Sequence, residues 1–256
     1  MTDYWKGKTV WIIGASSGIG AELTKQLVGR GAKVAISARS EDLLLRVAVC
    51  ADDTTGMVVA VPVDVTDANG LSEAGREVER LLGPLDLLIY SAGAWTPTDP
   101  PIIDMAAIER QVQVNYVGMI RAVSVVLPGM MARRNGVIAG VASATAYLAL
   151  PRAEGYGSTK AATNYFLRSL RGHVRRSNVR VVTINPGFVK TRLTADNDFP
   201  MPFIMEVEQA AAEVVRGLEN GKVEIHFPRR LTLPMKFLNW LPRSLSEWIL
   251  VRAFRV

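Results

Sequence analysis

The feature that most constrains the fold is the regular alternation of short apolar runs with longer helical patterns. The runs are rich in β-branched residues and almost continuously apolar, as expected for strands covered on both faces. They fall at 8–14, 33–38, 57–63, 85–92, 136–143, 179–186 and 222–227, with helical patterns at 18–29, 41–51, 67–82, 104–132, 154–176 and 207–220. This alternation predicts right-handed crossovers and an open, doubly wound parallel sheet flanked by helices.

The composition is that of a globular protein. The chain has 256 residues, 49% hydrophobic and 21% charged, which is enough to bury a large core. No repeat or low-complexity linker divides it, so we predict one domain over 1–228, with 229–256 as a helical extension. The first ten residues lack the pattern of a secretory signal, and no uninterrupted apolar run is long enough to span a bilayer. We therefore expect a cytoplasmic protein.

Cysteine and histidine are too sparse for a metal site. Cys50 is the single cysteine, which rules out an internal disulfide and fits a reducing compartment. His173 and His226 lie far apart, with no second cysteine nearby, so we expect no bound metal. We predict that Cys50 packs as a small apolar residue in the helix at 41–51.

A glycine-rich turn, GASSGIG, follows the first predicted strand. It places Gly14, Gly18 and Gly20 between that strand and the helix at 18–29. Glycines there allow a tight turn, a close approach of the backbone to a pyrophosphate, and close packing of the helix, whose first amides then face the phosphates. The position of the turn indicates a dinucleotide-binding site.

Four further residues complete a recognisable set. In the stretch GYGSTKAA, Tyr156 and Lys160 lie four residues apart, on one face of the predicted helix. Ser143 lies 13 residues before Tyr156, at the end of a predicted strand, and Asn115 lies in the helix at 104–132. Together with the GxxxGxG spacing of the glycines, these residues resemble the short-chain dehydrogenase/reductase family over residues 6–192.

The resemblance implies a Rossmann-type sheet of seven strands in the order 3-2-1-4-5-6-7 and hydride transfer between a nicotinamide cofactor and a carbonyl or alcohol. Tyr156 would exchange a proton with the substrate oxygen, Ser143 would orient that oxygen, and Asn115 would hold a relay water. Lys160 would bind the nicotinamide ribose, and its ammonium would lower the pKa of Tyr156 from about 10. The Tyr-x-x-x-Lys spacing favours carbonyl chemistry over enoyl reduction.

The cofactor-binding residues that this resemblance implies span the length of the predicted sheet edge. They are Gly14, Ser16, Ser17, Gly18, Ile19, Gly20, Arg39, Ser40, Asp64, Val65, Ser91, Ala92, Gly93, Tyr156, Lys160, Pro186, Gly187, Val189 and Thr191.

Three positions depart from the family pattern. Ile13 stands where the family usually has a threonine before the first glycine. Tyr90 and Ser91 replace two asparagines after the fourth predicted strand. The hydrogen bonds that support this central strand must therefore be made by other groups.

The end of the second predicted strand favours NADP(H) over NAD(H). Ala38 stands where similar NAD-dependent enzymes carry an aspartate, and Arg39 follows it. A guanidinium can bind a 2′-phosphate through two hydrogen bonds, with Ser40 or Ser16 adding hydroxyl donors. The alternative is that Arg39 is a solvated residue of a loop.

The segment 192–206 corresponds to the mobile substrate lid of the family. Its five large apolar residues offer an adaptable cover and suggest a hydrophobic substrate. They are Phe199, Met201, Phe203, Ile204 and Met205. The alternative is that these side chains pack on the core.

The last segment, 229–256, is basic and rich in aromatic residues. Phe237, Trp240 and Trp248 are interleaved with leucines and arginines. The segment carries most of the net charge of +6, through Arg229, Arg230, Lys236, Arg243, Arg252 and Arg255 against Glu247. Amphipathic helices of this composition lie on membrane surfaces, and the alternative is a helix pair docked on the domain or on a second subunit. Positive charge confined to an apolar tail excludes a nucleic-acid surface.

The sequence therefore predicts an NADP(H)-dependent oxidoreductase for a hydrophobic ketone or secondary alcohol, such as a steroid, a retinoid or a long-chain 3-oxo lipid. A non-catalytic NADP(H)-binding sensor that docks through its tail is the alternative. The resemblance implies a homodimer through the helices at 104–132 and 154–176, with a tetramer as the other arrangement.

Overall fold

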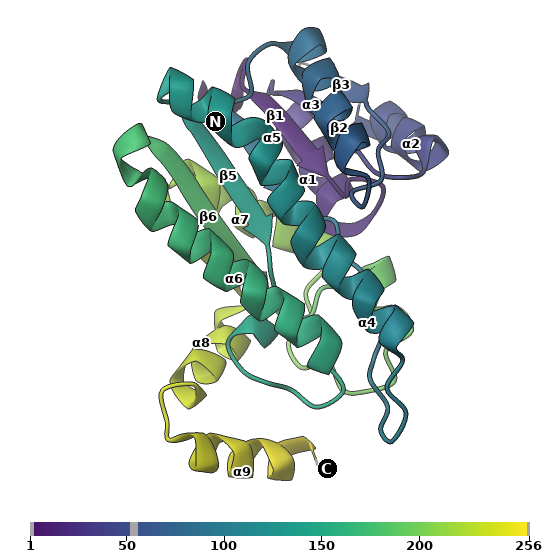
Figure 1. Cartoon of the computed structure of the whole chain (residues 1–256), viewed down its shortest axis with the longest axis vertical. Coiled ribbons are helices and arrows are strands. Elements are labelled where there is room, and N and C mark those ends of the chain that lie inside the picture. The colour runs from purple at the N-terminus through teal and green to yellow at the C-terminus, as the bar shows by residue number, and fades with distance from the viewer. Residues whose placement is uncertain (1–2, 52–55, 255–256) are drawn as a thin grey trace.

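The computed structural model describes residues 3–51 and 56–254. Seven parallel strands form one sheet in the order β3-β2-β1-β4-β5-β6-β7 (Figure 1). The strands are β1 Thr9–Ile13, β2 Lys33–Ser37, β3 Met57–Ala60, β4 Leu87–Tyr90, β5 Gly136–Val141, β6 Val179–Pro186 and β7 Glu224–Phe227. The predicted Rossmann-type sheet and its strand order are confirmed.

Helices follow almost every strand. The α-helices are α1 Gly18–Val28, α2 Glu41–Ala51, α3 Ala68–Leu82, α4 Met105–Val112, α5 Gly118–Arg133, α6 Glu154–Val174, α7 Val207–Glu219, α8 Arg229–Leu238 and α9 Arg243–Phe254. Shorter helical turns are η1 Asp3–Trp5, η2 Gln113–Val117, η3 Ala144–Ala146, η4 Arg175–Ser177 and η5 Arg192–Thr194.

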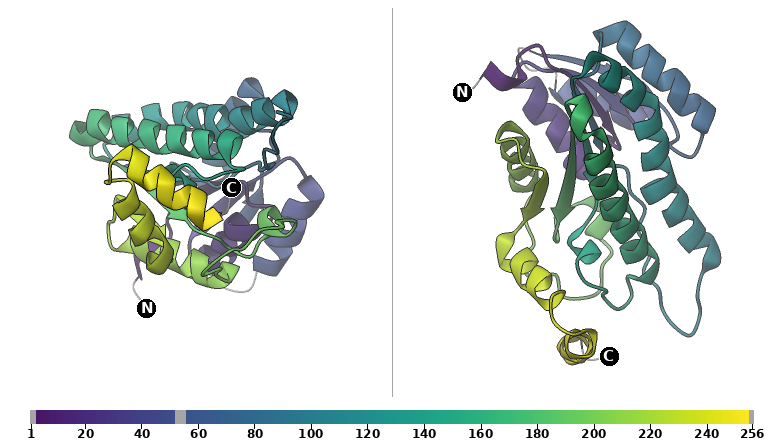
Figure 2. Two further views of the ribbon diagram at one scale, coloured as in Figure 1. Left: turned by 90° about the horizontal axis from the view of Figure 1, so that it is seen from below. Right: turned by 60° about the vertical axis from the view of Figure 1, so that its left-hand side comes forward.

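The sheet lies between two layers of helices (Figure 2, left). Along β1, Val10 and Ile12 point into the core formed with α1, α2 and α7, and Trp11 and Ile13 point into the core formed with α3, α5 and α6. All four side chains are fully buried. Because the central strands β1, β4 and β5 bury both faces, their sequences are continuously apolar rather than alternating. Burial of each large side chain stabilises the fold by about 1.5–3 kcal/mol.

The arrangement opens a crevice at the carboxyl edge of the sheet. β1 pairs with β2 on one side and with β4 on the other, so the connections diverge at this point and leave space between the loops. The predicted strands at 57–63, 85–92 and 136–143 extend beyond the observed ends at Ala60, Tyr90 and Val141. The apolar pattern continues into the loops that leave the sheet there, and these loops line the crevice.

The helical path Met105–Arg133 is long and apolar enough to cross a membrane by length and composition, although the sequence prediction excluded any such segment. In the structure, α5 packs on the sheet through Met119, Val123 and Val126, which are buried. One face of α5 therefore belongs to the core, and 39% of the apolar window is buried.

Two smaller findings concern α2 and the tail. Cys50 is exposed on α2, so its predicted burial is wrong; α2 turns Leu44 and Ala51 toward the core and Cys50 outward. The tail forms α8 and α9 after β7, at the lower end of the molecule in Figure 1. Arg255 of the predicted basic tail lies outside the described residues.

Candidate active site

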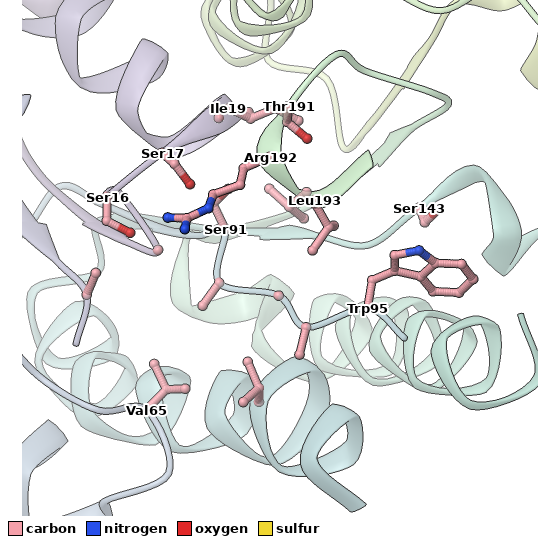
Figure 3. Close-up of a pocket in the computed structure, with 18 of the residues that line it drawn as sticks. Ser16, Ser17, Ile19, Val65, Ser91, Trp95, Ser143, Thr191, Arg192 and Leu193 are labelled. Carbon is pink, nitrogen blue, oxygen red and sulfur yellow. The ribbon is translucent and has the colours of Figure 1, made fainter. Parts of the chain in front are cut away.

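A cavity of about 860 Å³ opens at the carboxyl edge of the sheet (Figure 3). The sequence-predicted residues that line it are Gly14, Ser16, Ser17, Gly18, Ile19, Arg39, Ser40, Asp64, Val65, Ser91, Ala92, Gly93, Ser143, Tyr156, Lys160, Pro186, Gly187, Val189 and Thr191. Gly20 and Asn115 are the two predicted residues outside this lining, and both act from behind it.

The glycine turn is fixed by close approaches of the backbone. Gly14 has φ +88°, and a β-carbon there would lie 2.3 Å from the Ala92 nitrogen. A β-carbon on Gly20 would lie 2.3 Å from the Gly14 oxygen, which explains why Gly20 packs behind the cavity. Gly18 has φ +57°, a conformation that glycine adopts without strain. A side chain at Gly14 or Gly20 would therefore collide with the neighbouring backbone.

The first turn of α1 offers donors to an anion. Ser17 precedes α1 and makes no side-chain cap to it, so the amides of the first turn keep their hydrogen-bonding capacity. The positive end of the helix dipole points the same way. These groups fit the pyrophosphate of a dinucleotide.

A cation that no sequence motif predicts lies at the same place. Arg192 lines the cavity, and Figure 3 shows its guanidinium extended toward Ser16 and Ser17. It makes no ion pair within the described part of the chain. The signal in the sequence is a basic residue directly after Thr191.

The end of the cavity near β2 carries a second cation. Arg39 is exposed at the carboxyl end of β2 and, in the ranges that the structure describes, makes no ion pair. Ser40 accepts a hydrogen bond from the Leu43 amide at 3.4 Å, at the start of α2. Asp64 is held by the Thr66 amide and hydroxyl, both at 2.8 Å. The second strand therefore ends in a guanidinium and a hydroxyl, with no carboxylate at position 38.

Asn115 lies in η2, a π-helical turn between α4 and α5, and is buried. Its Oδ1 accepts from the Ala94 amide at 2.7 Å, and its Nδ2 donates to the Ala94 carbonyl at 2.9 Å. Nδ2 also donates to Thr159 Oγ1 at 3.0 Å. Asn115 therefore ties the loop after β4 to α6, the helix that carries Tyr156 and Lys160.

The substituted positions after β4 are supported in another way, as expected. The Tyr90 hydroxyl donates to the Val114 carbonyl at 2.5 Å from a fully buried position. A β-carbon on Gly118 would lie 2.6 Å from that hydroxyl. The phenol thus links the central strand to the long helical path.

Ser143, Tyr156 and Lys160 converge at one end of the cavity. Ser143 follows β5, and Tyr156 lies in the first turn of α6. Lys160 is buried one turn later, its Nζ 5.4 Å from the Tyr156 ring centroid and donating to the Val141 carbonyl at 2.9 Å. The Ser143 side chain is close enough to Tyr156 to lower the pKa of its hydroxyl. Both side chains belong to the lining of the cavity.

Burial dominates the protonation of this group. It raises the pKa of Tyr156 to about 12, and the hydrogen bond with Ser143 lowers that pKa only in part. Burial also lowers the pKa of Lys160 to about 8. Burial is therefore the largest influence on this phenol, and a lowering of its pKa by Lys160 together with a bound nicotinamide's positive charge stays a prediction.

A model of the short chain dehydrogenase family matches residues 8–199 of the chain. The chain belongs to this family. An uncharacterized oxidoreductase of Myxococcus xanthus is 34% identical over 240 residues, covering 94% of this chain and 95% of that protein. A fatty acyl-CoA reductase of Acinetobacter baylyi is 31% identical over 192 residues, covering 74% of this chain and 65% of that protein.

A solved structure gives the same assignment. A short chain dehydrogenase from Burkholderia cenocepacia in complex with NADP matches with a TM-score of 0.81 at 25% identity, over 96% of this chain and 98% of that chain. The protein is thus an NAD(P)-dependent oxidoreductase of the short-chain dehydrogenase family, and its glycine turn and free helix amides fit such a cofactor.

Trp95 is a site residue of this dehydrogenase that no motif predicts. It follows β4, lines the cavity, and meets the Tyr156 ring edge-on, with the centroids 5.2 Å apart. Its indole nitrogen donates to Asn197 Oδ1 at 2.9 Å. Trp95 therefore connects the catalytic end of the cavity with the segment 192–206.

That segment covers the cavity differently from the prediction. Its residues that line the cavity are Arg192, Leu193 and Thr194, and the five predicted apolar side chains lie elsewhere. Phe203 and Ile204 are exposed, whereas Met205 packs on the core beside Val189. Hydrogen bonds from Trp95 to Asn197 and from Arg152 to Asp198 hold the middle of the segment, and Phe199 packs against Phe188.

Proposed function

We propose that this dehydrogenase is an NADP(H)-dependent carbonyl reductase or alcohol dehydrogenase for a hydrophobic ketone or secondary alcohol. The observation that carries the proposal is the position of Ser143 and Tyr156. They lie in the same cavity as the glycine turn and the two guanidinium groups of Arg39 and Arg192. A proton donor thus shares a cavity with groups suited to a phosphorylated dinucleotide.

The cations favour NADP(H). Arg39 and Ser40 would hold the 2′-phosphate, because no described ion pair engages Arg39 and no carboxylate stands at the end of β2 to repel the phosphate. The first turn of α1, with Ser17 and Arg192, would hold the pyrophosphate. The NADP in the Burkholderia structure supports this choice. When bound, the cofactor supplies or accepts the hydride.

The protonation of Tyr156 suits ketone reduction at neutral pH. Since burial raises its pKa to about 12, the phenol holds its proton and can donate it to the substrate carbonyl oxygen. Ser143 would hold that oxygen by a hydrogen bond and stabilise its developing charge. Lys160, with a pKa of about 8, remains mostly cationic at pH 7 and lies where it would stabilise the phenolate that forms.

Apolar groups near Tyr156 favour a hydrophobic substrate. Trp95 meets the Tyr156 ring, and Val114 and Leu193 also line the cavity. The Acinetobacter relative is named for fatty acyl-CoA, which supports a long acyl chain among the candidate classes. Steroids and retinoids satisfy the same apolar lining.

The direct test is a substrate panel followed by NADPH absorbance. It compares long-chain 3-oxo compounds, steroid ketones and retinal with a short water-soluble ketone, each with NADPH and with NADH. We expect NADPH oxidation on at least one lipophilic class, faster than on the short ketone. Tight NADPH binding without turnover on any member would contradict the proposal and favour the non-catalytic sensor.

A further inference from the structure

Large apolar side chains are exposed along the two C-terminal helices. On α8 and its final turn, Leu233, Phe237 and Trp240 are 52%, 65% and 89% exposed. Their spacing of four and three residues places them along one side of the helix. On α9, Leu245 and Trp248 are also exposed. The exposed apolar residues thus form a stripe rather than isolated positions.

The opposite side of each helix is already packed. Met235 of α8 and Leu250 of α9 are buried in one cluster with Ala144 and Leu148, which follow β5. A helix that is apolar on two sides needs two apolar neighbours. The protein supplies one of them, and the stripe is the side left without a neighbour in the described chain.

These helices lie at the end of the molecule that carries the cavity. A β-carbon on Gly187, which lines the cavity, would lie 2.7 Å from Leu231 of α8. In Figure 1 and in the right panel of Figure 2, α9 and the loop that leads into α4 reach the same lower end. Ile102 and Ile103 of that loop are 77% and 58% exposed. A flat surface can therefore touch both α9 and the loop that carries Ile102 and Ile103.

The charge beside the stripe is positive. Arg229 and Arg230 are exposed at the start of α8, and the Arg252 guanidinium lies 3.9 Å from the Trp248 ring centroid. None of these three arginines makes an ion pair within residues 3–51 and 56–254, whereas Lys236 is paired with Glu224 at 2.9 Å. Arginine beside exposed Trp and Leu is the pattern of a helix in a lipid interface, where the guanidinium reaches anionic headgroups.

We propose that the stripe on α8 and α9, together with Ile102 and Ile103, docks on an anionic lipid bilayer. These residues are the docking face. A second copy of the chain would fit the same face less well, because a two-fold contact would bring the unpaired arginines of both copies together. The inference goes beyond the proposed function, since docking places the cavity beside a reservoir of apolar molecules whatever the reaction.

The test is vesicle sedimentation of the full chain. One set of vesicles is phosphatidylcholine alone, and the other contains a fraction of phosphatidylglycerol. We expect binding to the anionic vesicles that weakens with salt. The double variant Phe237→Ser/Trp240→Ser should lower the partition coefficient by about tenfold or more. Arg229→Gln/Arg230→Gln should lower it by about fivefold for each charge, on anionic vesicles only.

The matched control is Leu45→Ser/Val49→Ser, which removes exposed apolar side chains from α2. This helix lies at the upper right of Figure 1, away from α8 and α9. It should sediment like the wild type. Thermal unfolding and turnover of a soluble ketone, measured in parallel, separate a failure of docking from a failure of the fold or of the proposed reaction.

Two results would overturn the proposal. One is equal sedimentation of the wild type, the Phe237/Trp240 variant and the control, with or without anionic lipid. The other is a wild-type dimer that ignores vesicles and dissociates in the Phe237/Trp240 variant, which would show that a second copy covers the face.

Discussion

The sheet core differs from the segments 192–206 and 229–254 in its use of apolar residues, although α7 and β7 after Thr191 also belong to the core. Before Thr191, apolar strands are buried on both faces, and Asn115 and Lys160 are fixed by hydrogen bonds to neighbouring strands and loops. After Thr191, Phe203, Phe237 and Trp240 are exposed. The first region therefore fixes the chemistry by internal contacts. The second leaves several large apolar side chains exposed.

The largest effect should come from a substitution in the first region, at Tyr156. Tyr156→Phe removes the proton donor and keeps the ring, so kcat for ketone reduction should fall about 10²- to 10⁴-fold. NADPH binding, followed by fluorescence titration, should persist. Tyr165→Phe is the matched control, because Tyr165 is 80% exposed on the same helix. Equal activity of the two variants would show that Tyr156 is not the proton donor.

The buried ammonium should leave a signature in stability. Folding lowers the pKa of Lys160 from 10.5 to about 8, so between these values the unfolded chain binds more protons than the folded one. Wild-type stability should therefore rise with pH relative to Lys160→Met, by about 3 kcal/mol in total between pH 7 and 10.5. Urea unfolding across this range measures the difference.

The control for this experiment is Lys25→Met, at an exposed position of α1. Its curve should stay parallel to that of the wild type. A Lys160→Met curve that is also parallel would show that desolvation of Lys160 does not act on folding.

The cofactor end of the cavity should discriminate between two ligands. Arg39→Asp should weaken NADPH binding about 10- to 100-fold more than NADH binding, because the charged hydrogen bonds to the 2′-phosphate are lost. Titration with each cofactor measures the two dissociation constants. Arg46→Asp makes the same charge change on α2 outside the cavity and should leave their ratio unchanged. If Arg39→Asp weakened the binding of both cofactors by a comparable factor, Arg39 would not contact the 2′-phosphate.

The two sides of α8 sharpen the comparison within one helix. Met235→Ala removes a buried side chain and should cost about 2 kcal/mol or more of stability. Phe237→Ala removes an exposed ring and should change stability by less than about 0.5 kcal/mol. Chemical unfolding of both variants is the measurement. A large cost for Phe237→Ala would mean that its ring is covered in solution.

The smallest effect on cofactor binding concerns Arg192. The pyrophosphate is common to both cofactors, so Arg192→Gln should weaken the binding of NADPH and of NADH equally. We expect a loss of about fivefold in each affinity, because Arg192 is a cation at an exposed position. Lys190→Gln is the control, since Lys190 pairs with Glu206 at 3.3 Å instead of lining the cavity. A loss of NADPH binding without a loss of NADH binding would place Arg192 at the 2′-phosphate instead.

The sequence predicts well where local geometry decides. The strand order follows from the alternation and the resemblance. The position of Tyr156 and Lys160 on one face of α6 follows from the helical repeat. The raised pKa of Tyr156 has another origin, because it depends on burial by the loop after β4 and by Trp95, which are distant in the sequence. The exposure of Cys50 depends on which side of α2 meets the sheet. Arg192 belongs to no motif, and only the fold brings it to the cavity.

The account depends on a carbonyl oxygen that is held by the Tyr156 and Ser143 hydroxyls together. A crystal structure with NADP and an unreactive ketone analogue tests this most directly. The account predicts both hydroxyls within hydrogen-bond distance of that oxygen, with Lys160 still beneath the phenol. A bound analogue whose oxygen lies away from both hydroxyls would contradict it.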